Sequence, residues 1–312
     1  MKYLENRCTD AHWNMAHDEF LLEGLSGTVF CLWQNAPAVI IGLNQSAYAE
    51  VNLPYLEAHG VQLARRVTGG GAVYHDLGNL NYSIAGPARE VERHYDTVAA
   101  ALRRLGVPAQ RSGRNDILVE GRKCSGYAKR LYKDRMMIHG TLMWDVDLDA
   151  LTAALAVPGS KLAAAGIASV RSRVANLKPY LPQFPDLESF RSALQSLLAD
   201  GDPEISLTPA QKADIDRLAD EKFRSWDWVY GHSPAASFES TRTFPCGSVT
   251  ARYTLKHGVF EVLEFSGDFI GSRPASELAD RLLGRRLEDI LQEPVGDYFD
   301  GLSSDEFCTL FR

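Results

Sequence analysis

The stretch RRVTGGGAVYHDLGNLNYSI, Arg65 to Ile84, places two arginines ahead of three consecutive glycines and then continues as an alternating apolar strand. Three adjacent glycines are unfavourable in a folded chain, because each loses more backbone entropy than any other residue and offers no side chain to pack. The stretch therefore predicts a position at which the fold or a ligand needs bare backbone.

Two structures would use three bare glycines at this position. A tight hairpin between VQLARRV (61–67) and AVYHDL (72–77) needs positive φ angles, which glycine adopts readily. A glycine turn can instead point several N–H groups at one anion and allow a phosphate to approach closely. The glycines alone do not decide between a structural turn and a phosphate site.

The composition indicates a globular protein of ordinary type. The chain has 312 residues, of which 45% are hydrophobic and 23% charged, enough for one large core or for two unequal domains. No long apolar run follows a basic region near the start, and no run of about 18 apolar residues follows later. We therefore expect a cytoplasmic protein with neither a secretion signal nor a membrane span.

Charge and cysteine content argue against further classes. The net charge of -7 argues against a broad, non-specific grip on nucleic acid, so an anionic ligand would need a concentrated site. The cysteines are widely separated and form no CxxC pair, which predicts neither a disulfide framework nor a zinc site. They are Cys8, Cys31, Cys124, Cys246 and Cys308.

Alternating apolar runs bounded by glycine, proline or asparagine predict strands, and amphipathic stretches between them predict helices. The predicted strands lie at 28–33, 38–42, 61–67, 71–77, 80–85, 115–120, 121–131 and 136–144. The predicted helices lie at 10–25, 94–106, 148–157, 187–200 and 208–224. This mixture predicts a mixed α/β or α+β core.

The composition changes near Ser240. Residues 226–240, WDWVYGHSPAASFES, turn polar with glycine, proline and serine, and a short run of strands with one helix follows them. We therefore predict a large domain over 1–240 and a small accessory domain over 241–312.

A second informative stretch, GRNDILVEGRKCSGYAKRLYKDRMMIHGTLMW, runs from Gly113 to Trp144. It predicts a hairpin that turns at Glu120 and Gly121, followed by a third strand. Regular alternation along the second arm would put Lys123, Ser125 and Tyr127 on one face. Cys124, Gly126 and Ala128 would then lie on the opposite face.

A lysine in the middle of this arm has two interpretations. A lone lysine in a strand commonly protects a sheet edge from aggregation. Here Asn115 and Asp116 lie on the neighbouring arm and His139 lies on the next strand, so polar groups would converge with Lys123 on one concave face.

Together the two stretches resemble lipoate-protein ligases. RRVTGGGAVYHDLGN is similar to the signature of that family, which usually has serine where this chain has Thr68, and GRKCSGYAKR with HGTL resembles its lysine-bearing segment. LWQNAPAVIIGLNQSAYAEVN, KLAAAGIASVRSRVANL and FRSWDWVYG are similar to three further segments. The resemblance implies a large mixed-sheet catalytic domain of the biotin/lipoate protein ligase type with a small α+β C-terminal domain.

The resemblance also implies a reaction. ATP activates lipoate to lipoyl-AMP, and the lipoyl group passes to a lysine of an apo lipoyl domain in 2-oxoacid dehydrogenase complexes or of the glycine cleavage H protein. Mg²⁺ is expected with ATP, and Asp116 is the candidate metal ligand. We expect a monomer that binds neither nucleic acid nor membranes.

Site residues carry over position by position. Lys123 matches the catalytic lysine, which touches both the acyl carboxyl oxygen and the α-phosphate and so serves both half-reactions. The implied ATP-binding residues are Arg66, Gly71, Ala72, Val73, Tyr74 and Lys123. The implied lipoate-binding residues are Lys123, Trp33, His75 and His139. Further candidates are Gly69, Gly70, Asn79 and Asp116.

Several of these residues also have plain structural interpretations. Trp33 would serve equally as core, and His75 and His139 as buried, hydrogen-bonded histidines. Arg171 and Arg173 would either contact phosphate or hold a loop in place.

Three other functions are weighed against a ligase. A biotin-protein ligase shares a similar lysine segment, but its glycine loop is of the GRGRxGR type. A cysteine-dependent octanoyl or lipoyl transferase would need a reactive thiol, and Cys124 is the only cysteine near the site. A binding module that has lost turnover is the non-enzymatic alternative.

Overall fold

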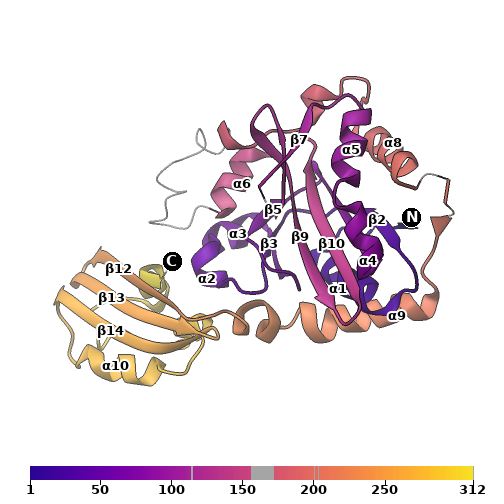
Figure 1. Ribbon diagram of the computed structural model, residues 1–312. Helices are drawn as coiled ribbons and strands as arrows, with labels where there is room; N and C mark the ends of the chain where they lie inside the picture. The colour runs from indigo at the N-terminus through magenta and orange to yellow at the C-terminus, as the bar shows by residue number, and fades with distance from the viewer. Residues whose placement is uncertain (114, 156–171, 200, 203, 312) are drawn as a thin grey trace.

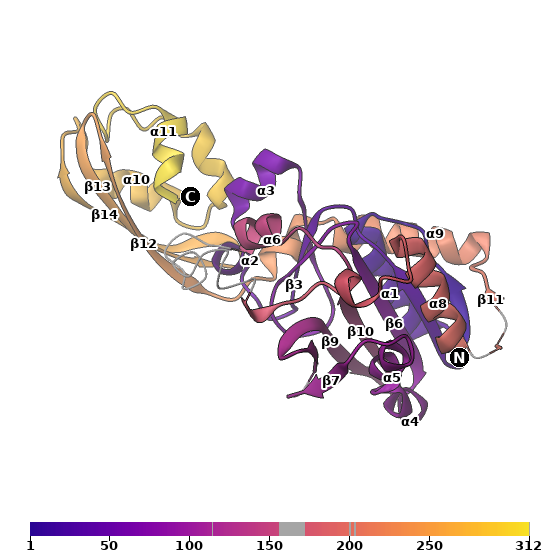
Figure 2. The same cartoon turned by 90° about the horizontal axis from the view of Figure 1, so that it is seen from above.

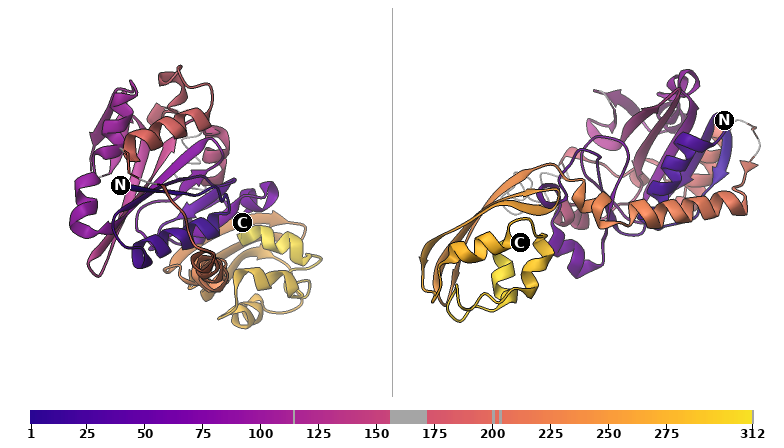
Figure 3. Two further views of the ribbon diagram at one scale, coloured as in Figure 1. Left: turned by 90° about the vertical axis from the view of Figure 1, so that its right-hand side faces the viewer. Right: turned by 90° about the horizontal axis from the view of Figure 1, so that it is seen from below.

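The structure is a computed structural model that describes residues 1–113, 115–155, 172–199, 201–202 and 204–311 (Figure 1). A large unit contains two β-sheets with helices packed around them, and a small unit at the C-terminal end contains a third sheet. A helical connector links the two units (Figure 3). The predicted α+β class is confirmed. None of the described helices is long and apolar enough to cross a membrane.

In the described part of the chain, the main sheet has eight strands. Their order is β11 (Glu204–Ile205), β1 (Lys2–Glu5), β2 (Val29–Trp33), β6 (Asn79–Pro87), β10 (Arg135–Met143), β9 (Arg122–Tyr132), β8 (Asp116–Val119) and β7 (Ala109–Ser112). β1 pairs in parallel with β2 and β11, and the other neighbours are antiparallel. Each predicted run of alternation overlaps an observed strand, while β1, β7 and β11 are strands that the alternation did not predict.

Helices cover both faces of the main sheet. On one face, α5 (Thr97–Arg104) and α8 (Leu187–Ala199) lie side by side and bury their apolar residues against β2, β6 and β10 (Figure 2). On the other face lies α1 (Ala11–Gly24), whose N-cap residue Asp10 accepts a hydrogen bond from the Trp13 N–H. The short helices α2 (Ala47–Glu50), α3 (Leu53–His59), α4 (Ala88–Val91) and α6 (Leu148–Leu155) lie in the connections.

The second sheet packs beside α1 and contains β4 (Gln62–Arg65), β3 (Ala38–Ile41) and β5 (Val73–His75), in that order. β3 pairs in parallel with β4 and antiparallel with β5. The hairpin interpretation of the three glycines is therefore wrong, because the strands before and after them lie on opposite edges of β3. Residues 66–72, the glycine loop, cross the end of β3 instead of turning back tightly.

The pairing of β9 with β8 contains a β-bulge. Asp116 lies opposite Gly126 and Ile117 lies opposite Ser125, but Leu118 lies opposite Lys123, so Cys124 is an extra residue. The predicted regular alternation of this arm is wrong for that reason. Lys123 shares a face with Gly126 instead of with Ser125.

The small unit has its own core. β12 (Ala236–Phe244), β13 (Gly247–Lys256) and β14 (Val259–Phe269) form an antiparallel sheet, and α10 (Ala275–Leu282) and α11 (Ser304–Cys308) pack against it. Ser240 lies inside β12, so we propose a division between the units just before Ala236, which leaves this sheet whole.

The connector continues the predicted helix at 208–224. α9 (Pro209–Leu218) begins with a capping box formed by Thr208 and Gln211, with proline at its first position. Two π-helical turns, η3 (Ala219–Phe223) and η4 (Asp227–Gly231), extend it toward the small unit (Figure 3).

Candidate active site

The glycine loop is organised by a buried arginine. Arg66 donates hydrogen bonds from Nη2 to the carbonyl oxygens of Gly69 and Gly71, both at 2.8 Å, and from Nη1 to the carbonyl oxygen of Ile40 at 3.0 Å. Among the described residues, no carboxylate forms an ion pair or hydrogen bond with Arg66. Burial lowers the pKa of Arg66 to about 10, so the guanidinium remains a cation at neutral pH. The loop therefore encloses a positive charge that an anionic ligand can complement.

The three glycines differ in what the fold asks of them. Gly70 has a φ of 98°, and a Cβ there would lie 2.8 Å from Arg66 Nη2, so its backbone requires glycine. Gly69 and Gly71 have no atom within 4 Å of the place where a Cβ would stand. Because packing does not demand glycine at Gly71, its bare backbone leaves space for something outside the protein.

Arg65, the neighbour of Arg66, points to the connector instead. It is fully buried and donates to the carbonyl oxygens of Gln45 at 2.6 Å and Val229 at 2.7 Å, and to Ser233 Oγ at 3.0 Å. The adjacent arginines therefore have separate tasks: one shapes the glycine loop and the other fastens the connector to the large unit.

Lys123 projects toward the glycine loop from β9. Its Nζ lies 2.8 Å from Asp116 Oδ1, and a Cβ at Gly126 would stand 2.8 Å from the same Nζ. Gly126 thus leaves room for the end of the lysine side chain. The Ala175 N–H donates to the Lys123 carbonyl oxygen at 2.9 Å, which holds the strand at this point from the other side.

Lys123 and the glycine loop meet at a cavity of about 160 Å³. Nine residues predicted for the site line it: Trp33, Arg66, Gly70, Gly71, Ala72, Val73, His75, Lys123 and His139. Four other candidates do not line it, namely Gly69, Tyr74, Asn79 and Asp116. The Tyr74 side chain packs in a core cluster on the other side of β5. Asn79 donates to Asn81 Oδ1, and the asparagines that line the cavity are Asn81 and Asn115.

The tautomer of His75 follows from its neighbours. Asn14 Nδ2 donates to Asn35 Oδ1 at 2.8 Å, which turns Asn35 Nδ2 toward His75 Nδ1 at 3.0 Å. His75 Nδ1 is then the acceptor and Nε2 carries the hydrogen. Burial, with the charge of Arg66, lowers the pKa of His75 to about 3, so the ring is neutral.

This tautomer gives the cavity a hydrogen-bond donor. His75 Nε2 is buried and has no hydrogen-bond partner among the described residues, and His75 lines the cavity. The Nε2–H group therefore suits an oxygen of a ligand. Asn35, which sets this tautomer, was not predicted, because an asparagine in a loop gives no sign of the histidine that it meets.

Family comparisons agree with this geometry. Residues 10–199 match the model of the lipoyl protein ligase A/B catalytic domain, and residues 233–311 match that of the bacterial lipoate protein ligase C-terminus. The chain is 36% identical to lipoate-protein ligase LplJ of Bacillus subtilis over 99% of both chains. The chain belongs to the lipoate-protein ligase family.

Solved structures of lipoate-protein ligases share the fold. A bi-partite lipoate protein ligase from Thermoplasma acidophilum, studied with its E2 lipoyl domain, is 29% identical with a TM-score of 0.67, and the match covers 74% of this chain and 96% of that chain. A lipoate-protein ligase A bound with ATP is 27% identical with a TM-score of 0.64, over 74% of this chain and 98% of that chain.

Cys124 does not suit the thiol chemistry of a transferase. As the extra residue of the bulge it is fully buried in the core, where its Sγ lies 3.4 Å from the Ile117 carbonyl oxygen. Burial raises the pKa of this thiol to about 12, so it is not a thiolate at neutral pH. In this lipoate-protein ligase, Cys124 shapes β9 and turns away from the cavity.

Asp116 is a poor metal ligand by itself. It is paired with Lys123, and no group of three or more His, Cys, Asp or Glu side chains in the described residues is arranged to hold a metal ion. Magnesium commonly binds through one or two carboxylates together with substrate phosphates. Of the two arginines that would either contact phosphate or hold a loop in place, Arg173 does not line the cavity, and Arg171 lies outside the described residues.

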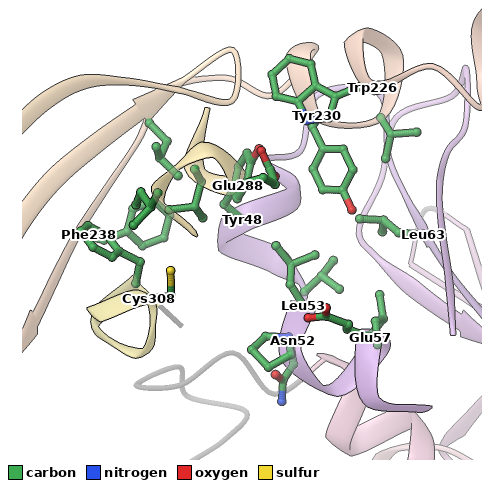
Figure 4. Close-up of a pocket in the computed structure, with 18 of the residues that line it drawn as sticks. Tyr48, Asn52, Leu53, Glu57, Leu63, Trp226, Tyr230, Phe238, Glu288 and Cys308 are labelled. Atoms are coloured by element: carbon green, nitrogen blue, oxygen red, sulfur yellow. The ribbon is translucent and has the colours of Figure 1, made fainter. Parts of the chain in front are cut away.

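A larger cavity of about 870 Å³ lies where the small unit meets the large one (Figure 4). Tyr48 and Leu53 of the large unit face Phe238 and Cys308 of the small unit, with Trp226 of the connector beside them. No residue predicted for the ligase site lines this cavity. The smaller cavity, where the glycine loop and Lys123 meet, therefore remains the predicted place of the ligase chemistry.

Proposed function

We propose that the cavity between the glycine loop and Lys123 binds lipoate and ATP and forms lipoyl-AMP. The observation that carries the proposal is the meeting of two cations, Arg66 and Lys123, with the bare backbone of Gly71 in one cavity. A carboxylate and a triphosphate are both anions, so bringing them together requires positive charge and fixed N–H dipoles. The ATP-bound ligase of similar fold supports the assignment.

In the first half-reaction, a lipoate carboxylate oxygen attacks the α-phosphorus, and the bond to pyrophosphate breaks. Lys123 offers a compact charge with three donors, which suits a group that bridges the carboxylate and the α-phosphate. The His75 Nε2–H group suits the second carboxylate oxygen. Substrates that fill the cavity would exclude water, which would otherwise hydrolyse the mixed anhydride.

In the second half-reaction, the amine of an acceptor lysine attacks the acyl carbon, the bond to AMP breaks, and the amine loses a proton. Negative charge then develops on the carbonyl oxygen, and the Lys123 ammonium group is placed to stabilise it. We propose apo lipoyl domains of 2-oxoacid dehydrogenase complexes and the glycine cleavage H protein as acceptors. The bi-partite relative studied with its E2 lipoyl domain supports this class of partner.

Magnesium would enter with ATP and neutralise part of the phosphate charge. Asp116 is the proposed protein ligand only if the lysine that it now pairs with turns to the substrate. The residues assigned to the two half-reactions do not depend on it.

The proposed function is tested with ATP, lipoate and an apo lipoyl domain. We expect pyrophosphate release that requires lipoate, followed by a gain of one lipoyl group per acceptor in the intact mass. Acylation of the acceptor from a lipoyl or octanoyl thioester without ATP would instead establish a transferase. Release of no pyrophosphate and no change in acceptor mass would establish a binding module.

The loop assignment predicts a separate effect for Gly71→Val. We expect ATP to bind about tenfold more weakly, or by about 1.4 kcal/mol, because the branched side chain occupies the phosphate approach. The melting temperature should change little, because Gly71 has no positive φ and nothing stands near its Cβ position. Titration calorimetry with ATP and a thermal scan measure the two quantities.

Gly69→Val is the matched variant, since Gly69 is equally free of neighbours but does not line the cavity. We expect a smaller effect on ATP binding there. Equal weakening in both variants, or a large loss of stability in Gly71→Val with normal ATP binding, would contradict the loop assignment.

A further inference from the structure

A buried carboxylate outside the predicted site ends two chains of hydrogen bonds. Asp18 on α1 is 1% exposed, and none of its bonds in the described structure goes to a lysine or arginine. Its Oδ2 lies 2.6 Å from His139 Nδ1, and its Oδ1 accepts from Ser83 Oγ at 2.6 Å. An ionised carboxylate this deep in the fold is costly unless donors surround it, so these two contacts hold its charge in place.

One chain leads from Asp18 to the glycine loop. Arg66 Nε donates to Thr68 Oγ1 at 3.0 Å, and Thr68 Oγ1 lies 2.7 Å from His139 Nε2. Because the carboxylate only accepts, His139 Nδ1 carries the hydrogen; Nε2 then accepts the Thr68 hydroxyl hydrogen. Each donor therefore points toward Asp18, and the Arg66 cation and the Asp18 anion compensate each other through two neutral groups.

The other chain leads to Trp33, whose role at the lipoyl tail is implied by the family resemblance. Trp33 Nε1 donates to Ser83 Oγ at 2.9 Å, and the Ser83 hydroxyl donates to Asp18. This fixes the rotation of an indole ring that lines the cavity and is itself 2% exposed.

We propose that Asp18 is a positioning residue for both substrates of the ligase. Through His139 and Thr68 it orients Arg66 and with it the nucleotide-binding glycine loop; through Ser83 it orients Trp33 beside the lipoyl tail. The proposal rests on the proposed function. It assigns Asp18, Thr68 and Ser83 roles that follow from hydrogen bonds joining five separate parts of the chain.

Each of the two hydrogen-bond chains can be broken without the other. Thr68→Val keeps the shape of the side chain and removes the hydroxyl in the chain to Arg66, while Ser83→Ala removes the hydroxyl in the chain to Trp33. We expect Thr68→Val to raise KM for ATP about tenfold and leave KM for lipoate nearly unchanged. Ser83→Ala should raise KM for lipoate and leave KM for ATP nearly unchanged. Pyrophosphate release, measured against each substrate in turn, gives both constants.

Two further variants complete the test. Thr68→Ser keeps the hydroxyl and should restore both constants to the values of the parent enzyme. Asp18→Asn should raise both KM values and lower kcat, because an amide can donate to His139 Nδ1 and reverse the direction of the chain. If Asp18→Asn does not fold, Thr68→Val and Ser83→Ala, each of which breaks one hydrogen-bond chain, still test the positioning role.

The outcomes separate the proposal from its premise. Absence of pyrophosphate release by the parent enzyme would overturn the proposed function. Titration calorimetry of the same variants with ATP and with lipoate would then measure how each hydrogen-bond chain affects binding, without turnover. Equal changes in both constants for Thr68→Val and Ser83→Ala, or no change in either, would overturn the positioning role. A shift confined to the matching substrate, rescued by Thr68→Ser, supports it.

Discussion

Replacing Lys123 with alanine is expected to slow both lipoyl-AMP formation and lipoyl transfer by about 1,000-fold, or about 4 kcal/mol on the transition-state scale. The same ammonium group is placed to bridge the lipoate carboxylate and the α-phosphate and later to stabilise charge on the acyl oxygen. Pyrophosphate release measures the first step. Single-turnover transfer from supplied lipoyl-AMP to an apo lipoyl domain measures the second step.

Two control variants sharpen this result. Gly126→Ala keeps the lysine but places a Cβ 2.8 Å from its Nζ, so it should displace the charge and cause an intermediate loss. Lys129→Ala removes an exposed lysine from the same strand and should have little effect on either step. Full transfer activity of Lys123→Ala from supplied lipoyl-AMP would restrict the lysine to the first step.

The second large effect is expected at Arg66. Arg66→Met should weaken ATP binding about 100-fold, or by about 2.7 kcal/mol, because it removes the cation and releases the glycine loop that the guanidinium holds. It should also lower the free energy of unfolding by about 2 kcal/mol, since carbonyl oxygens of Ile40, Gly69 and Gly71 lose their donor. ATP titration and denaturant unfolding measure these changes.

Arg66→Lys separates charge from geometry. A lysine keeps the positive charge but cannot reach three carbonyl oxygens in a fixed fork, so we expect most of the loss in ATP binding to remain. Arg104→Met, at an exposed arginine on α5, controls for the removal of one charge. Normal ATP binding by Arg66→Lys would show that the positive charge alone matters and that the hydrogen bonds from the guanidinium to the carbonyl oxygens are not needed.

The strands that sequence patterns predicted share a physical cause. Runs such as 28–33 and 80–85 alternate or stay apolar over several residues and end at glycine, proline or asparagine, so local sequence is enough to identify them. β11 has two residues and β7 has three exposed ones, Gln110 to Ser112, and neither carries an apolar pattern. Edge strands of this kind form because the neighbouring strand offers them hydrogen bonds, and the order of residues along the sequence does not show that partner.

The errors in the glycine loop and β9 also have a physical cause. The hairpin between 61–67 and 72–77 was plausible locally, but β3, earlier in the chain, pairs with both strands. The bulge at Cys124 changes which residues share a face, and nothing in the residue types of 122–128 signals an unpaired position. Long-range pairing decided the first point, and an irregularity within the β8–β9 hairpin decided the second.

Recognition of the site depended on the type of residue. Lys123 stands out because a lysine is unusual in the middle of a strand, and the glycines stand out because three adjacent glycines are unfavourable in a folded chain. Their resemblance to a ligase signature gave them roles. Asp18 and Asn35 gave no such signal, because each acts through a histidine that another segment supplies. Positioning residues of this kind become visible only when the distances between segments are known.

The bulge in β9 makes the site sensitive to the length of this strand as well as to substitutions. Lys123 and Gly126 share a face although three positions separate them, and the extra residue between them allows this. Loss of Cys124 would give regular pairing with the lysine and the glycine two positions apart, so the lysine would keep its face. Insertion of one residue beside the bulge would instead turn the lysine toward the core, even with the lysine itself retained. In related chains, the length of the interval between this lysine and this glycine is therefore informative about a working site only together with the pairing of the strand.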